Sequence, residues 1–302
     1  MTGSQNFDVI IIGGSYAGLS TAMALGRSLR NVLVIDGGTP CNKQTPHSHN
    51  FLTNDGKTPG EIDRLAKQQV QMYGTVKFLD GLAGFGAKTK NGFEIHTTGG
   101  EVFTAKKLVF ATGIKDVFPP IPGFAECWGI SVLHCPYCHG YEARHQPTGL
   151  IANGDAGFEM AALIANWTND LTLYTNGKSS LSAEQKAKLE KHHIGIIETE
   201  IERLEHKNGY VRNILFRNGT RTQVNVIYAR LPFVQHSSIP QELGCELTKE
   251  GYISTDPAQR TSLQGVYACG DNVTRIRTVA NAVSMGSTTG LMVNKELVEE
   301  DF

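Results

Sequence analysis

The sequence predicts an α/β protein with two nucleotide-binding βαβ units, the second of which is inserted within the first domain. Two predicted strands, at residues 8–12 and 149–152, are each followed at once by a small-residue turn and then by a helical pattern. Buried strands that alternate with helices are typical of a parallel sheet. A further strand and helix follow the second unit and complete the first domain. We therefore expect a first domain of residues 1–116 and 246–302, and a second of residues 117–245.

The first unit carries the stronger nucleotide-binding pattern. Residues 8–12 form a strand, residues 19–29 a helix, and a second apolar strand ends in Asp36. The turn of residues 13–18 lies between the first strand and the helix, with Ser15 at the middle glycine of the usual G-x-G-x-x-G pattern. Such a turn brings helix amides to a pyrophosphate, and the acid binds ribose hydroxyls. The order of these features predicts a Rossmann-like dinucleotide-binding domain.

The rest of the first domain is predicted to contain one helix and three short strands before the chain leaves it. The helix spans residues 59–73, and the strands span residues 76–79, 92–97 and 107–110. The last strand runs into Ala111, Thr112 and Gly113, small residues that let the backbone approach a ligand closely. A polar loop precedes the helix, and we expect its histidines, His47 and His49, to be ordinary loop residues.

The second unit has a degraded turn, because Ala152 and Gly154 stand where two glycines are expected. Its predicted elements are a proline-rich crossover at 116–123, strands at 149–152, 171–174 and 194–197, helices at 158–167 and 182–191, and a small sheet of strands 211–216 and 223–229. The chain returns to the first domain near residues 243–248. Strands at 251–254 and 265–271 and a helix at 279–299 then close it.

Composition limits the partners that the protein can have. The chain has 302 residues, is 40% hydrophobic and carries a formal net charge of -1 without a basic block, so nucleic acid and anionic membranes are not expected partners. Residues 1–7 are polar and the apolar run at 9–12 is too short for a signal peptide or a membrane span, so we expect a cytoplasmic protein. Six cysteines in that compartment do not predict a disulfide framework. Four are expected to be small buried or loop residues: Cys41, Cys127, Cys245 and Cys269.

The remaining two, Cys135 and Cys138, form a Cys-X-X-Cys pair. Two thiols at this spacing can close into a disulfide and open again, and the pKa of one of them is lowered. Pro136 stiffens the loop between them. The same spacing serves as half of a zinc site, but the chain has no second such pair, and His134 and His139 lie too close to complete a zinc ribbon. The pattern therefore favours redox chemistry, with no metal.

These segments together resemble the low-molecular-weight thioredoxin reductase family of flavoproteins, over essentially the whole chain. The resemblance rests on residues 13–18, residues 111–113, the Cys135/Cys138 pair and residues 261–271, in that order. It implies FAD in the first domain, a homodimer, and a disulfide that exchanges electrons with the flavin and with a thiol partner. Residues 135–142, Cys-Pro-Tyr-Cys-His-Gly-Tyr-Glu, are most similar to the branch that contains gliotoxin-type dithiol oxidases, which close a small-molecule disulfide and pass electrons to oxygen.

The resemblance also implies which residues bind FAD. They are Gly13, Gly14, Ser15, Ala17, Gly18, Asp36, Gly37, Asn50, Ala111, Thr112, Gly113, Gly270, Asp271, Thr278 and Val279. The glycines of the first turn would wrap the pyrophosphate and Asp36 would bind the adenosine ribose. Asn50 would lie near the flavin, and Gly270 and Asp271 at the ribityl and phosphate end. The helix that opens at Thr278 would face the flavin pyrimidine, where its dipole stabilises the anionic reduced form.

Three residues are implied in catalysis. Cys138 would lie next to the flavin and Cys135 would exchange with substrate. His139 stands where the family usually has aspartate, and an unperturbed histidine is a base at neutral pH. The partner would be a thioredoxin-like protein or a small-molecule dithiol or disulfide, and the sequence leaves the direction of the reaction open.

The second nucleotide site departs from the family. Residues 174–177, Tyr-Thr-Asn-Gly, replace the family's His-Arg-Arg segment, and the nearest cation is Lys178. A 2′-phosphate is best bound by arginine, so we expect NADPH to be a poor electron donor. The alternatives are an oxygen-dependent dithiol oxidase, a non-catalytic flavin redox sensor, and a flavin hydroxylase or oxidase with incidental cysteines.

Overall fold

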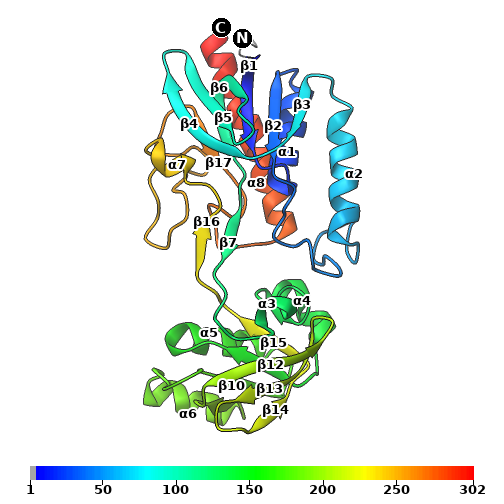
Figure 1. Cartoon of the computed structure of the whole chain (residues 1–302), viewed down its shortest axis with the longest axis vertical. Coiled ribbons are helices and arrows are strands. Elements are labelled where there is room, and N and C mark those ends of the chain that lie inside the picture. Colours follow the sequence, from blue (N-terminus) through cyan, green and yellow to red (C-terminus); the bar gives the residue numbers. More distant parts are fainter. Residues whose placement is uncertain (1–4) are drawn as a thin grey trace. The chain divides into compact units, whose positions relative to one another are not determined.

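The structure, a computed structural model, describes residues 5–302. Residues 1–4, which belong to the polar N-terminus considered above, lie outside the described residues. The chain forms two compact units (Figure 1). The first consists of Met1–Lys43, Asn50–Lys115 and Val234–Phe302, and the second of Gln44–His49 and Asp116–Phe233. Both units contain a sheet with neighbouring parallel strands and with helices, as the predicted α/β class requires.

The first unit is built on a seven-stranded sheet in the order β3-β2-β1-β6-β5-β4, with β17 also paired to β6. The strands are β1 (Gln5–Ile12), β2 (Val32–Asp36), β3 (Val76–Asp80), β4 (Ala83–Thr89), β5 (Gly92–Thr97), β6 (Val102–Phe110) and β17 (Val266–Ala268). Strand β5 pairs in the antiparallel sense with both β4 and β6. Val9, Ile10 and Ile11 of β1 are fully buried, because both faces of this central parallel strand are covered.

Helices from both ends of the chain pack together in this unit. The helices of the unit are α1 (Tyr16–Arg27), α2 (Pro59–Gln71), α7 (Ile239–Glu242) and α8 (Val279–Asp301). Figure 1 shows α8 beside α1, and glycines allow the close packing. A Cβ added at Gly286 would lie 2.2 Å from the carbonyl oxygen of Ala17, and one at Gly290 would lie 2.6 Å from Cβ of Ala24. Larger residues at these positions would push α8 off α1.

The second unit contains a five-stranded parallel sheet in the order β11-β10-β9-β15-β8 and an antiparallel sheet of β12, β13 and β14. The strands are β8 (Val132–Leu133), β9 (Thr148–Ile151), β10 (Leu171–Tyr174), β11 (Gly195–Ile197), β12 (Ile201–Lys207), β13 (Tyr210–Phe216), β14 (Arg221–Gln223) and β15 (Val226–Ala229). The helices are α3 (Phe124–Cys127), α4 (Pro136–Ala143), α5 (Gly154–Ile164) and α6 (Ala183–Lys191). A separate two-stranded sheet pairs β7 (Ile114–Asp116) with β16 (Phe233–Gln235).

The hydrophobic cores of the two units differ in whether their residues come from one continuous stretch of the chain. Both clusters of the second unit are made only from residues between Ile121 and Leu231. In the first unit, the cluster around Ile10 also contains Val266, and the cluster around Val9 contains Leu297. The first unit therefore needs both ends of the chain to complete its core.

Several predicted elements need correction. Helix α1 begins at Tyr16 and α5 at Gly154, in each case within the predicted turn. The predicted strand at 251–254 is reduced to one isolated bridge between Leu247 and Ile253. The predicted strand at 223–229 is divided, because β14 pairs with β13 while β15 joins the parallel sheet. The charged strand β12 and the glycine-containing strand β4 were not predicted.

Among residues 5–302, the longest helix is α8, and neither it nor any other helix has the length and apolar character needed to cross a bilayer. The same residues contain no cluster of histidine, cysteine and acidic side chains arranged to hold a metal ion.

Candidate functional site

The Cys135–Cys138 disulfide lies at the N-terminus of α4. The two Cα atoms are 5.3 Å apart, and Cys135 is the N-cap residue of the helix. The sulfur of Cys135 accepts a hydrogen bond from the backbone N–H of Cys138 at 3.2 Å. Pro136 fits the first position of the helix. A backbone N–H at that position has no acceptor within the helix, so proline, which has no N–H, loses no hydrogen bond there. The pair therefore heads a helix, which corrects the expectation that it lies in a loop.

The two sulfurs differ in their surroundings. Cys135 is buried, with 9% of its surface exposed, whereas Cys138 is partly exposed. Exposure thus gives no support for Cys135 as the exchanging sulfur. The helix N-terminus does, because its amides and dipole stabilise a thiolate and lower its pKa.

His139 follows Cys138 on α4 and is half-buried. Burial lowers the pKa of His139, and the neighbouring His49 lowers it further, while Glu142 raises it. The net direction is downward, so the imidazole is neutral at neutral pH and can accept a proton. Local sequence patterns could not connect His139 with His49, which we had expected to be an ordinary loop residue.

The first glycine turn has the close packing that a dinucleotide site requires. Gly13 has φ +106°, and a Cβ there would lie 2.3 Å from the carbonyl oxygen of Ala111, while a Cβ at Gly18 would lie 1.8 Å from that of Gly13. Ser15 is the N-cap of α1, with φ -90° and ψ -163°. This extended backbone is open to any residue, so the missing middle glycine does not disturb the turn.

The predicted ribose acid meets this turn directly. Asp36 accepts a hydrogen bond from the backbone N–H of Gly14 at 3.2 Å. Asp63 of α2 is a second carboxylate near Asp36, and its pKa is raised by burial and by the charge of Asp36. Sequence patterns missed Asp63, because nothing in its own segment marks it. The neighbouring Gly37 packs against Leu82, whose Cδ2 would lie 2.6 Å from an added Cβ.

The ends of β6 and β17 also meet the turn. A Cβ at Gly270 would lie 3.0 Å from Cβ of Ala17. The fully buried Asn272 donates from Nδ2 to the carbonyl oxygen of Phe110 at 2.8 Å and to Oγ1 of Thr112 at 3.4 Å. Its Oδ1 has no hydrogen-bond partner among the described residues. A polar ligand bound at the turn could donate a hydrogen bond to this buried oxygen.

The remaining predicted residues lie in several places. Gly113 has φ +63°, which suits a turn after β6. Asp271 lies 3.6 Å from Nε of Arg277. Thr278 caps α8 by accepting the N–H of Asn281 at 3.1 Å, so Val279 is the first residue of that helix. The backbone N–H of Asn50 donates to Asp55 at 2.7 Å, within its own loop.

In the second turn, between β9 and α5, side chains of the protein itself hydrogen-bond around the start of the helix. Asn153, the N-cap of α5, accepts hydrogen bonds through Oδ1 from the N–H groups of Gly154 and Ser180, both at 2.9 Å. Asp155 lies in the first turn of α5 and accepts from Gln185 at 2.7 Å. A carboxylate and an amide therefore lie where a pyrophosphate would meet the helix N-terminus.

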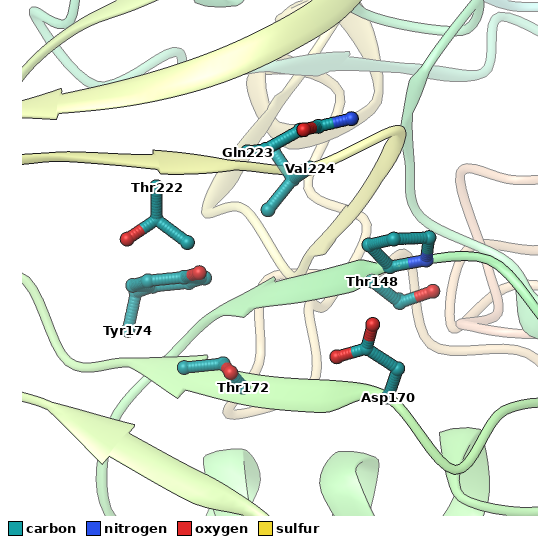
Figure 2. Close-up of a pocket in the computed structure, with 8 residues that line it drawn as sticks. Thr148, Asp170, Thr172, Tyr174, Thr222, Gln223 and Val224 are labelled. Atoms are coloured by element: carbon teal, nitrogen blue, oxygen red, sulfur yellow. The ribbon is translucent and has the colours of Figure 1, made fainter.

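A cavity of about 370 Å³ lies elsewhere in the second unit (Figure 2). It is lined by Pro147, Thr148, Asp170, Thr172, Tyr174, Thr222, Gln223 and Val224, and Figure 2 shows Tyr174 between Thr222 and Thr172. Thr148 is the first residue of β9, whereas the turn follows the last. Nucleotides bind at the carboxyl ends of parallel strands, so this cavity is not the nucleotide site.

A disulfide on an α/β scaffold with two dinucleotide-type turns defines the class of a flavin-dependent disulfide oxidoreductase. Residues 7–286 match the family "Pyridine nucleotide-disulphide oxidoreductase", and the chain belongs to it. It is 32% identical to the thioredoxin reductase tcpT of Claviceps purpurea, over 99% of this chain and 97% of that protein. It is 29% identical to the thioredoxin reductase aclD of Aspergillus oryzae, over 98% of each chain.

A solved structure agrees with these relatives. The oxidoreductase from Agrobacterium tumefaciens is 34% identical and superposes with a TM-score of 0.91, over 98% of this chain and 99% of that one. These comparisons confirm the predicted thioredoxin reductase-like fold and the resemblance on which the prediction rested. The chain is an FAD-dependent disulfide oxidoreductase of the thioredoxin reductase-like kind.

Proposed function

We propose that the enzyme exchanges thiols and disulfides through Cys135 and Cys138, with Cys135 as the sulfur that meets the substrate and His139 as the proton acceptor. The observation that carries the proposal is the disulfide at the N-terminus of α4, where Cys138 N–H donates to the Cys135 sulfur. The substrate is a dithiol or disulfide, either a small molecule or a thioredoxin-like protein. We further propose that the enzyme is a cytoplasmic homodimer.

With a dithiol substrate, His139 accepts the proton of the first thiol. The resulting thiolate attacks the sulfur of Cys135, the Cys135–Cys138 bond breaks, and Cys138 leaves as a thiolate. The second substrate thiol gives its proton to solvent and attacks the substrate sulfur of the mixed disulfide, which releases the cyclic product and the Cys135 thiolate. The substrate loses two electrons and two protons, and the same steps in reverse reduce a substrate disulfide. FAD, when bound, supplies the acceptor or donor of that electron pair.

The residues of the first turn fit FAD. Gly13 and Gly18 leave a backbone surface free of side chains, and Asp36 is held beside the turn by Gly14. We propose that α1 binds the pyrophosphate with its N-terminal amides and Asp36 the ribose. Asn272 Oδ1, buried and without a hydrogen-bond partner among the described residues, would accept a hydrogen bond from the cofactor.

We propose that NADPH is a poor electron donor. Asp155 places a negative charge at the N-terminus of α5, and Asn153 uses the amides of Gly154 and Ser180. Residues 174–177 also lack the arginines that would bind a 2′-phosphate. Each missing charge-assisted hydrogen bond costs about 1.5–3 kcal/mol, so two of them weaken binding on the order of a hundredfold or more.

The occupied second turn favours one specific alternative, an oxygen-dependent dithiol oxidase. In such an enzyme electrons enter from the dithiol and leave to oxygen, so no nucleotide is needed in the second unit. A non-catalytic redox sensor would carry the same disulfide but would show no repeated turnover.

The deciding experiment is anaerobic reduction of the purified holoenzyme by NADPH, NADH or dithiothreitol, each added separately. We expect dithiothreitol to bleach the flavin absorbance quickly and NADPH slowly, and we expect the Cys135→Ser and Cys138→Ser variants to lose the response to dithiothreitol. Fast bleaching by micromolar NADPH would refute the proposal about the donor. Undiminished bleaching by dithiothreitol in both variants would refute the disulfide pathway.

A further inference from the structure

We infer that His49 and Glu142 are positioning residues for His139, and that the three side chains form one acid–base cluster beside the redox disulfide. The inference deepens the proposed function, because it rests on His139 as the proton acceptor in thiol exchange. It assigns a role to His49, which we expected to be an ordinary loop residue, and to Glu142, the last residue of the Cys-Pro-Tyr-Cys-His-Gly-Tyr-Glu segment.

Helix α4 fixes two of the three side chains. His139 and Glu142 are three residues apart on this helix, and residues at that spacing lie on the same face. Cys138 immediately precedes His139, so the cluster begins next to the disulfide. Glu142 is 44% exposed, which places its carboxylate at the solvent end of the cluster.

The third side chain comes from the loop Gln44–His49, which belongs to the same compact unit as α4. The rings of His49 and His139 meet edge to face, with centroids 6.4 Å apart and an angle of 89° between their planes. Nδ1 of His49 lies 3.6 Å from Oε1 of Glu142. The His49 side chain is 19% exposed, so it lies deeper than the carboxylate that it faces. The loop therefore packs His49 against both helix residues.

The loop Gln44–His49 packs closely against Gly129. A Cβ at Gly129 would lie 3.0 Å from Nε2 of Gln44 and 3.0 Å from Oγ1 of Thr45. Gly129 also has φ +74°, which disfavours other residues. A larger residue at Gly129 would displace Gln44 and Thr45, and with them the loop that carries His49.

His49 and Glu142 shift the pKa of His139 in opposite directions. Burial lowers the pKa of His139 most, the charge interaction with His49 lowers it further, and the carboxylate of Glu142 raises it by favouring the protonated ring. His47 and Tyr228 are further titratable residues that interact with members of the cluster. His47 lies beside His49 with ring centroids 6.3 Å apart, and Tyr228 of β15 has its pKa raised by burial and by Glu142. The balance leaves His139 neutral yet able to take a thiol proton.

The test uses His49→Gln and Glu142→Gln in the full-length holoenzyme. The titration of His139 is followed by NMR with labelled histidine in the oxidised, resting enzyme. The pH profile of disulfide reduction by dithiothreitol is measured by rapid quench and thiol counting. We expect His49→Gln to move the His139 midpoint and the acid limb of the profile to higher pH, and Glu142→Gln to move both to lower pH. A midpoint that moves by one pH unit changes the rate on the acid limb about tenfold.

His192→Gln is the matched control, because His192 is an exposed histidine at the end of α6 in the same unit. It should change neither readout. Shifts of the same sign in both variants, or no shift in either, would overturn the inference. Opposite shifts in the NMR titration with an unmoved rate profile would confirm the cluster and refute the proposed function of His139 as proton acceptor, so the two failures are distinguishable.

Discussion

Cys135 and Cys138 occupy different positions on α4, and this gives the two sulfurs different chemistry. Cys135 precedes the helix and its sulfur accepts a backbone N–H, whereas Cys138 lies within the first turn. A thiolate at the N-cap is stabilised by that N–H and by the helix dipole. The position on the helix therefore supports a division of roles that exposure does not.

This division can be tested by trapping. In a Cys138→Ser variant, Cys135 should form a stable mixed disulfide with a small disulfide probe such as 5,5′-dithiobis(2-nitrobenzoate), because the resolving thiol is absent. Peptide mass spectrometry identifies the modified residue and separates it from the exposed Cys41. A Cys135→Ser variant should give far less adduct at Cys138. Preferred trapping at Cys138 would assign the roles the other way round.

Asp63 is a half-buried acid whose pKa is raised by burial and by Asp36. The folded state therefore binds this proton more tightly than the unfolded state. Its contribution to stability is present at pH values below the unfolded pKa and is lost as the pH rises through the folded pKa.

The substitution Asp63→Asn removes the contribution of this carboxyl group to the pH dependence of stability. We expect the variant to be more stable than the wild type at pH 8 by less than about 1 kcal/mol, with a smaller gain at pH 4.5. Urea unfolding of the FAD-saturated protein at both pH values measures the difference. A gain that does not depend on pH would show that Asp63 acts through packing instead.

Sequence reasoning reached the residues that belong to a local pattern and missed those that meet only in the fold. Gly13, Gly18 and Asp36 were found because strand, turn and helix lie in one segment. His49 and Asp63 approach His139 and Asp36 through loop and helix packing, which no spacing in the chain records.

At the level of single elements, the first turn distinguishes positions that need glycine from one that does not. Gly18 has backbone oxygen 1.8 Å from the position of a Cβ, and backbone cannot move aside as a side chain can. Ser15 has an ordinary extended backbone.

We therefore expect Gly18→Ala to lose bound FAD and Ser15→Gly to keep it. The measurement is flavin absorbance per chain after desalting, with circular dichroism to show that both variants are folded. Full flavin content in Gly18→Ala would contradict the assignment of this turn to FAD.

Helix α5 gives a second test, of NADPH binding. Asp155→Asn removes a negative charge from the first turn, where a charge is worth about 0.3–1 kcal/mol. The rate of flavin reduction by subsaturating NADPH should rise roughly twofold to fivefold. Glu159→Gln, farther along the same helix, is the control and should leave the rate unchanged. An equal effect of both substitutions would mean that net charge, and not the helix N-terminus, controls the reaction.

The elements that were predicted well are apolar and continuous, such as β1 and β2. Helix α4 was not predicted, because eight residues with a proline and a glycine carry no helical period, and its start depends on Cys135 and Pro136 as cap and first residue. Strand β12 was not predicted because four of its seven residues, Glu202, Arg203, Glu205 and Lys207, are charged. Its two apolar residues, Ile201 and Leu204, are buried in the same hydrophobic cluster as Val211 and Ile214 of its partner β13.

At the level of the whole molecule, the second unit has the properties of an independently folding domain. Both of its hydrophobic clusters are formed within Asp116–Phe233. A fragment of residues 116–233 should fold cooperatively and close the Cys135–Cys138 disulfide. Thermal unfolding by circular dichroism and a dispersed amide NMR spectrum test this. A spectrum without dispersion would show that the loop Gln44–His49 or the first unit is needed for folding.

The interrupted first unit has a consequence for synthesis of the protein on the ribosome. Strand β6 is translated before the second unit, but its partner β17 and the helix α8 that packs on α1 are translated after it. At roughly 5–20 residues per second, β1 and α1 wait on the order of ten seconds or more without their cover. During that interval the nascent chain exposes apolar sheet surface to chaperones and to neighbouring chains, and this surface can close only after β17 and α8 have emerged from the ribosome.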